Sequence, residues 1–181
     1  MTNKYIVYKI NWRQIATHLI ATIFFIQAVK QFAILNNIEM IRAIEKYGYP
    51  EAFRHLANEG NIGPSLYYFV LCQRISALIA LLIAFIISLY LTIKNKGFWQ
   101  NSLIVLLTAL LLHRVGFMDN KITSAIFFSF GNIFSSLGLQ YKFIANGTLL
   151  ISIAAFIYFS KLTRSFIFSV RTNEQRMNNV L

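Results

Sequence analysis

Nineteen consecutive residues, from Ile75 to Ile93, carry no charge and are mostly Leu, Ile, Ala and Phe. At 1.5 Å per helical residue, this run reaches roughly 28 Å, close to the ~30 Å thickness of the hydrocarbon core of a bilayer. A helix of a soluble protein has one apolar stripe, whereas this run would be apolar on every side. Lipid offers the backbone no hydrogen-bond partners, so a helix is the structure that satisfies the amides of such a run. The run predicts an integral membrane protein.

The composition agrees with a helical membrane domain. Of the 181 residues, 57% are hydrophobic and 13% are charged, which leaves room for about four spans with short connections. The net charge of +11 could suggest nucleic-acid binding. The cations, however, flank apolar segments, where they set orientation and contact anionic head groups. We therefore expect an anionic lipid bilayer, and no nucleic acid, as their partner. The single cysteine, Cys72, excludes an intramolecular disulfide.

The apolar segments predict an all-α membrane protein whose four transmembrane helices form a bundle. A basic, aromatic interfacial segment at 1–13 precedes a membrane domain at 14–163, and a basic tail follows at 164–181. The four spans are expected at about 12–35, 66–93, 98–118 and 143–160. Small residues of the second span recur three and four positions apart and suit close helix contact: Ala77, Ala80 and Ala84.

Two connecting segments differ from the spans. The segment 36–65 carries four of the six acids, and its apolar spacing predicts one or two short amphipathic helices, broken at Gly48–Pro50. The segment 122–141 is uncharged but too rich in Ser and Asn for a comfortable span. Its large apolar residues are expected on one helical face: Phe127, Phe130, Phe134 and Leu137. An amphipathic or re-entrant helix fits it better than a fifth span, which would place the basic tail outside.

The distribution of cations orients the bundle. Cytoplasmic connections are enriched in Lys and Arg. The basic ends of the chain and the turn at 94–97 are therefore expected in the cytoplasm, and the acid-bearing loop 36–65 outside. This gives four spans with both termini cytoplasmic.

The topology brings five ionisable residues to one depth near the outer surface: Lys30, Arg74, His113, Arg114 and Asp119. Ionisable residues in spans are costly and tend to face a bundle interior or a watery cavity, so this polar cluster is a candidate site. Arg74 would pair with Asp119, and His113 would carry protons. In the alternative interpretation, the cations extend to the head groups and only anchor the helix ends.

The first span is the least apolar and supplies a second candidate site, which could line a pore or bind a ligand: Gln14, Thr17, His18 and Gln27. In the simpler alternative, His18 bonds to a neighbouring helix. A haem held by His18 and His113 is disfavoured, because their heights differ by on the order of 10 Å in this topology. The chain carries no recognisable catalytic or metal-binding motif, so we predict no enzymatic activity, no metal and no cofactor.

Part of the chain, roughly 12–118, resembles the DoxX-like family of small four-helix bacterial membrane proteins. The resemblance rests on Arg13, Phe24, Phe25 and Lys30 in the first span, Gly63–Pro64 before the second, and His113, Gly116 and Phe117 at the end of the third. Gln73 stands nearest the place where the family has a glutamate. Some DoxX-like proteins are membrane subunits linked to quinone or thiol redox partners. The resemblance implies an accessory subunit in a bacterial inner membrane.

Three functions from different classes follow from these features. The first, which we favour, is a non-catalytic inner-membrane accessory or scaffold subunit that acts in a complex or a homo-oligomer. Its contact surface would be formed by segments 36–65 and 119–142. The second is an oligomeric channel or pore-forming effector, lined by polar residues of the first span. The third is a quinone- or haem-linked redox subunit that uses His113 and Arg114.

Overall fold

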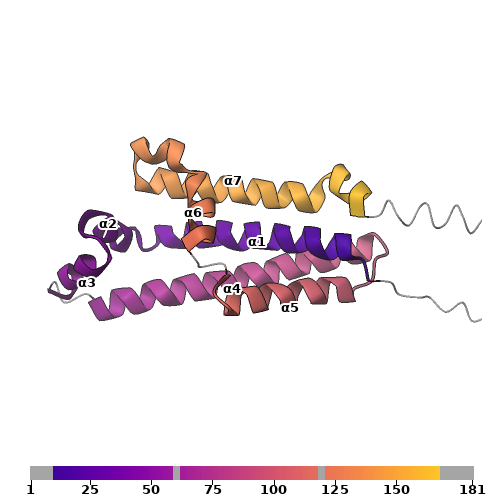
Figure 1. Cartoon of the computed structure of the whole chain (residues 1–181), viewed down its shortest axis with the longest axis horizontal. Helices are drawn as coiled ribbons and strands as arrows, with labels where there is room; N and C mark the ends of the chain where they lie inside the picture. Colours follow the sequence, from indigo (N-terminus) through magenta and orange to yellow (C-terminus); the bar gives the residue numbers. More distant parts are fainter. Residues whose placement is uncertain (1–9, 59–61, 118–120, 168–181) are drawn as a thin grey trace, which may run out of the picture.

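The computed structural model describes residues 10–58, 62–117 and 121–167, and every regular element in these ranges is a helix (Figure 1). In chain order the elements are α1 (Trp12–Leu35), α2 (Ile38–Tyr47), α3 (Tyr49–Asn58), α4 (Ile62–Lys94), α5 (Gln100–Arg114), α6 (Lys121–Ser129), the 3-10 helix η2 (Asn132–Leu137) and α7 (Leu139–Phe159). Residues 161–167 are also helical and follow a break at Ser160. The all-helical fold class is confirmed for the described residues.

Helix α1 occupies the centre of the molecule. It lies between α7 on one side and α4 with α5 on the other, and it packs against all three (Figure 1). Helix α4 runs antiparallel to α1, α5 returns beside both, and α7 runs antiparallel to α1. The beginning of α1, the α4–α5 turn and the end of α7 therefore lie at one end of the molecule, while α2 and α3 lie at the other.

Three helical segments are long and apolar enough to cross a membrane: Trp12–Leu35, Tyr67–Lys94 and Leu139–Phe159. They are compatible with a multi-pass membrane protein. The bounds of α1 are those predicted for the first span. The span expected at 98–118 is a helix of only 15 residues, α5, which is about 22 Å long and shorter than the ~30 Å hydrocarbon core. The fourth crossing therefore stays a prediction.

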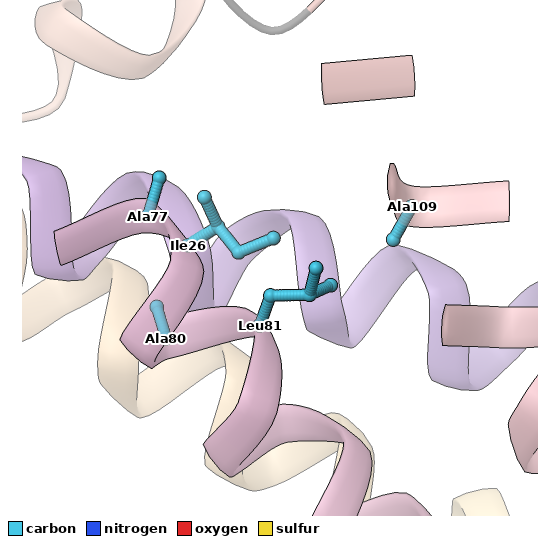
Figure 2. Packing of buried hydrophobic residues seen from close by; sticks show 5 residues of the cluster. All are labelled: Ile26, Ala77, Ala80, Leu81 and Ala109. Atoms are coloured by element: carbon cyan, nitrogen blue, oxygen red, sulfur yellow. The ribbon is translucent and has the colours of Figure 1, made fainter. Parts of the chain in front are cut away.

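Small side chains allow α4 to approach α1 and α5 closely. Ile26 of α1 and Leu81 of α4 pack with three alanines in one buried cluster: Ala77, Ala80 and Ala109 (Figure 2). Ala84 is also buried, so all three alanines predicted for a contact face of the second span lie in the interior. On the other faces of α4, large apolar side chains are exposed: Leu78, Ile79, Leu82, Ile83 and Ile86. Such a surface is suited to lipid.

The turns that separate the helices follow from local backbone chemistry. Gly48 has φ +76° and separates α2 from α3, at the predicted break. The rings of Tyr47 and His55 then stack, with 4.5 Å between their centroids, and join the two helices. After α5, Gly116 has φ +71° and its N–H donates to the carbonyl of His113. A left-handed glycine after the last helical turn is a common helix stop.

The segment 122–141 does not form one continuous helix. Helix α6 has nine residues, too few to cross a bilayer, and the chain then bends at Gly131. A Cβ at Gly131 would lie 2.3 Å from the backbone carbonyl oxygen of Lys142, so only glycine allows this close approach to α7. The bend separates the predicted apolar face. Phe127 is buried, whereas Phe130, Phe134 and Leu137 are exposed, so the prediction of one shared face is wrong.

Candidate functional site

The polar residues of α1 point into the molecule. Gln14, His18 and Gln27 are buried, and Thr17 is half-buried with its hydroxyl donating to the carbonyl of Arg13 at 2.7 Å. A polar residue in a membrane helix needs a partner, because lipid supplies none. Three of these four residues are therefore enclosed by other helices of the same chain. The partners of Gln14 and His18 on α4 and α5 were not predicted from the sequence.

A continuous hydrogen-bonded network joins α1, α4 and α5. His18 Nδ1 and the Ser88 hydroxyl lie 2.7 Å apart, which confirms the simpler alternative that His18 bonds to a neighbouring helix. The Ser88 hydroxyl donates to Ser102 Oγ at 3.0 Å, and Ser102 Oγ lies 2.8 Å from Thr92 Oγ1. Gln14 Nε2 donates to the same Thr92 oxygen. All five side chains are buried.

One arrangement of protons satisfies the hydroxyl groups of this network. The Thr92 hydroxyl donates to the carbonyl of Ser88, so Ser102 must donate to Thr92. Ser88 donates to Ser102, so its oxygen accepts from His18 Nδ1–H. His18 is then a donor at Nδ1, and its Nε2 faces away from Ser88. The bonded polar chain fixes how deeply α4 and α5 sit against α1.

The network continues to the end of the bundle where the α4–α5 turn lies. Asn101 Nδ2 donates to Gln14 Oε1 at 3.0 Å, and the Asn11 backbone N–H donates to Asn101 Oδ1 at 3.3 Å. Asn11 is also the N-cap of α1, since its Oδ1 accepts from the N–H of Gln14. Its Nδ2 donates to the carbonyl of Ile167, so the segment after α7 is tied to the start of α1.

Helix α7 contributes Tyr158 from the other side of α1. The hydroxyls of Tyr158 and Thr22 lie 2.8 Å apart, and the rings of Tyr158 and His18 meet edge to face with 5.5 Å between their centroids. His18 thus lies between Ser88 of α4 and Tyr158 of α7. A signal for these partners was present in the sequence, because Ser88, Thr92 and Tyr158 are polar residues within otherwise apolar spans.

The structure describes four of the five residues of the polar cluster predicted near the outer surface. One buried cluster contains Ile26, Ala77 and Ala109. Three of the predicted residues lie one helical turn from these cluster members, toward the end that carries α2 and α3: Lys30, Arg74 and His113. The structure therefore brings these helix positions to a similar depth. Arg74 and Arg114 are exposed, and His113 is half-buried. Asp119 lies outside the described residues, so its proposed pairing with Arg74 stays a prediction.

The two histidines do not lie opposite each other. Ser102 is at the level of His18, with which it shares the Ser88 hydroxyl. His113 is eleven residues further along α5, which corresponds to about 16 Å. A haem between two histidines needs them at one level, so His18 and His113 do not fit that group.

Charge is divided between the two ends of the molecule. The described charged side chains near the α4–α5 turn are all cationic, and we call this end the basic end: Arg13, Lys94, Lys96, Lys161 and Arg164. Exposed tryptophans stand beside them, namely Trp12 and Trp99. At the opposite end, α2 and α3 carry acids interspersed with bases, among them the exposed pair Glu51 and Arg54 at 3.9 Å.

The chain matches no protein-family model, no curated protein and no solved structure. The resemblance to the DoxX-like family therefore stays a prediction, and the geometry described above is the basis for the function proposed next.

Proposed function

We propose that this chain is a non-catalytic accessory or scaffold subunit of the bacterial inner membrane, acting in a membrane complex or as a homo-oligomer. The observation that carries the proposal is that buried polar side chains bond inside the bundle, whereas large apolar side chains lie on its surface. Gln14, His18 and Thr22 of the central helix bond to α4, α5 and α7 of the same chain, while large apolar side chains occupy the outer faces of α4. This is the arrangement of a self-contained bundle that presents an apolar surface to lipid or to another membrane helix.

The proposal includes four spans, with both termini in the cytoplasm. Helix α5 packs along α1 and α4, and its flanking aromatic residues Phe98, Trp99 and Phe117 extend its apolar length. A short span is accommodated by local thinning of the bilayer and by flanking cations that reach the head groups. The basic end would face the cytoplasm and its anionic lipids, following the rule that cytoplasmic connections are rich in Lys and Arg.

The outer end would supply the contact surface. None of the residues of η2 is buried, and Ile133 is 84% exposed. Exposed large apolar residues that lie near the end of a bundle suit a protein partner or the outer surface of the membrane. Helix α2 adds exposed charged side chains at the same end, namely Glu39, Arg42 and Glu45. We propose η2 and α2 as the main contact elements.

The burial of polar residues favours a scaffold over a pore. A conduit between several copies needs a polar lining, but Gln14 and His18 are enclosed within one chain and bonded to Thr92 and Ser88. The surface that one copy would offer to the next is instead apolar.

Native mass spectrometry of protein released gently from its own membrane tests the proposal. We expect a defined homo-oligomer or a bound partner chain for the unaltered protein. The substitution Ile133→Asp should release that partner. Leu162→Asp, a matched control of similar exposure near the basic end, should retain it.

Three results would overturn the scaffold proposal. The first is a monomer without any partner in the mildest detergent. The second is a purified protein that carries haem or quinone, which would favour the redox function. The third is a protein that conducts ions in liposomes and loses the currents in a His18→Leu variant, which would favour the pore function.

A further inference from the structure

The polar network near the basic end and two buried amides near the opposite end differ in how they are satisfied. Each buried polar side chain of the network makes a hydrogen bond to another helix. The two amides instead keep side-chain atoms that have no hydrogen-bond partner among the described residues. Gln31 of α1 is 0% exposed, and neither its Nε2 nor its Oε1 has a hydrogen-bond partner among the described residues. Asn146 of α7 is 1% exposed, and its Oδ1 is likewise without a partner there.

Both amides lie where α1, α6 and α7 meet. One turn before Gln31, Ala28 packs against Phe127 of α6 and Leu150 of α7. Phe127 also accepts a hydrogen bond from Asn146 Nδ2 through its backbone carbonyl. Next to Gln31, the ring of Phe32 fills the space at Gly147, beside Asn146, where a Cβ would lie 2.8 Å from ring atoms. Gln31 and Asn146 are therefore at the same level, on the side of the α1–α7 interface that α6 covers.

The unpaired atoms define the chemistry of the group that would bind them. The hydrogen bond to Phe127 identifies the free atom of Asn146 as its carbonyl oxygen, an acceptor. Gln31 offers a second acceptor, Oε1, and a donor, Nε2. A matching ligand must be small and must donate two hydrogen bonds and accept one through a single atom. A water molecule does this. A quinone carbonyl only accepts, and a metal cation would leave the Gln31 donor unpaired.

We propose that one ordered water molecule binds at this junction, bridges Gln31 and Asn146, and thereby joins α1 to α7 beneath α6. Buried polar groups without protein partners are usually satisfied by ordered water, which typically makes about three hydrogen bonds. The water would replace, at the outer end, the direct side-chain bonds that join the helices near the basic end.

Millisecond radiolytic hydroxyl labelling tests this directly, because radicals made from a bound internal water oxidise the side chains that touch it. We expect oxidation of the buried ring of Phe127 in the unaltered protein. Tyr158 is also buried and is intrinsically more reactive, but its neighbours are satisfied by protein groups, so it should be labelled several-fold more slowly. Gln31→Leu should abolish the labelling of Phe127. Ser152→Ala on the exposed face of α7 should leave it unchanged.

The proposal is overturned if Phe127 stays unlabelled in the unaltered protein, or if Gln31→Leu is labelled at the same rate. It is also overturned if a lipid hydroxyl occupies the place, which native mass spectrometry would show as a bound molecule lost in Gln31→Leu. Should that variant fail to fold, the comparison of Phe127 with Tyr158 in the unaltered protein still decides between the outcomes.

Discussion

His18 shows how one buried polar residue depends on partners from several helices. Ser88 lies beside its Nδ1, and Tyr158 packs against its ring from the opposite helix. In lipid, a lost hydrogen bond cannot be replaced by bulk water, although other polar groups of the chain can partly compensate. We therefore interpret His18 as a residue that holds helices together rather than as a reactive group.

Ser88→Ala tests this role of the network. The substitution removes the hydroxyl that connects His18 to Ser102 and leaves His18 Nδ1–H buried without its acceptor. We expect the free energy of unfolding to fall by about 1 kcal/mol, the scale of interhelical hydrogen bonds in membranes. Unfolding by SDS titration in bicelles measures it.

Ser152→Ala is the matched control for that experiment. The Ser152 hydroxyl donates to the carbonyl of Thr148 within α7, and the residue is exposed, so its loss should change the stability very little. Equal effects of the two substitutions would show that the network does not hold the helices together.

At the scale of helices, two glycines decide how α7 packs, because the absence of a side chain lets neighbouring groups lie close to the backbone. Gly147 is buried against the ring of Phe32, and Gly131 is buried against the backbone of α7. Neither contact can be predicted from a sequence motif, because glycine occurs within apolar helices for several structural reasons. Gly147 lets α7 lie close to α1, and Gly131 lets the chain after α6 lie close to α7.

Gly147→Ala should destabilise the α1–α7 contact, since the new Cβ would lie 2.8 Å from the Phe32 ring. Overpacking of this kind typically costs about 1–3 kcal/mol. The thermal midpoint in detergent, followed by size-exclusion chromatography, measures the loss.

A double-mutant cycle with Phe32→Leu separates overpacking from other effects. The smaller side chain should make room for the methyl group, so that the double variant is more stable than the sum of the single effects predicts. Strict additivity would indicate that Gly147 and Phe32 do not constrain each other.

At the scale of the whole molecule, the separation of charge is the basis of the proposed orientation in the membrane. The beginning of α1, the α4–α5 turn and the segment after α7 are far apart in sequence but share the basic end (Figure 1). Four crossings, as proposed, would place all three in the cytoplasm. Without a crossing by α5, the segment after α7 would be on the opposite side from the α4–α5 turn.

Single cysteines introduced after Cys72→Ser distinguish these topologies. In spheroplasts, an impermeant maleimide should label Glu45→Cys and Leu137→Cys directly, but Lys96→Cys and Lys161→Cys only after permeabilisation. All four positions are exposed. Labelling of Lys161→Cys from outside, together with protection of Leu137→Cys, would show that α5 does not cross.

The sequence by itself determined the helical class, the long apolar helices and the break at Gly48, because these depend on local hydropathy and backbone preference. The range predicted for the first span is that of α1. The sequence also identified His18, Gln14 and Gln27 as unusual, because a polar residue in an apolar span differs from its neighbours.

Only the tertiary structure decided which partners those residues have. Ser88, Thr92, Ser102 and Tyr158 come from three other helices, and their depths against α1 depend on how the helices slide and rotate in packing. The bend at Gly131 has the same origin. It depends on contact with Lys142 of α7 rather than on the local periodicity that predicted one apolar face. Hydropathy reports how well each residue suits lipid, whereas the pairing of buried polar groups is set by contacts between helices distant in the sequence.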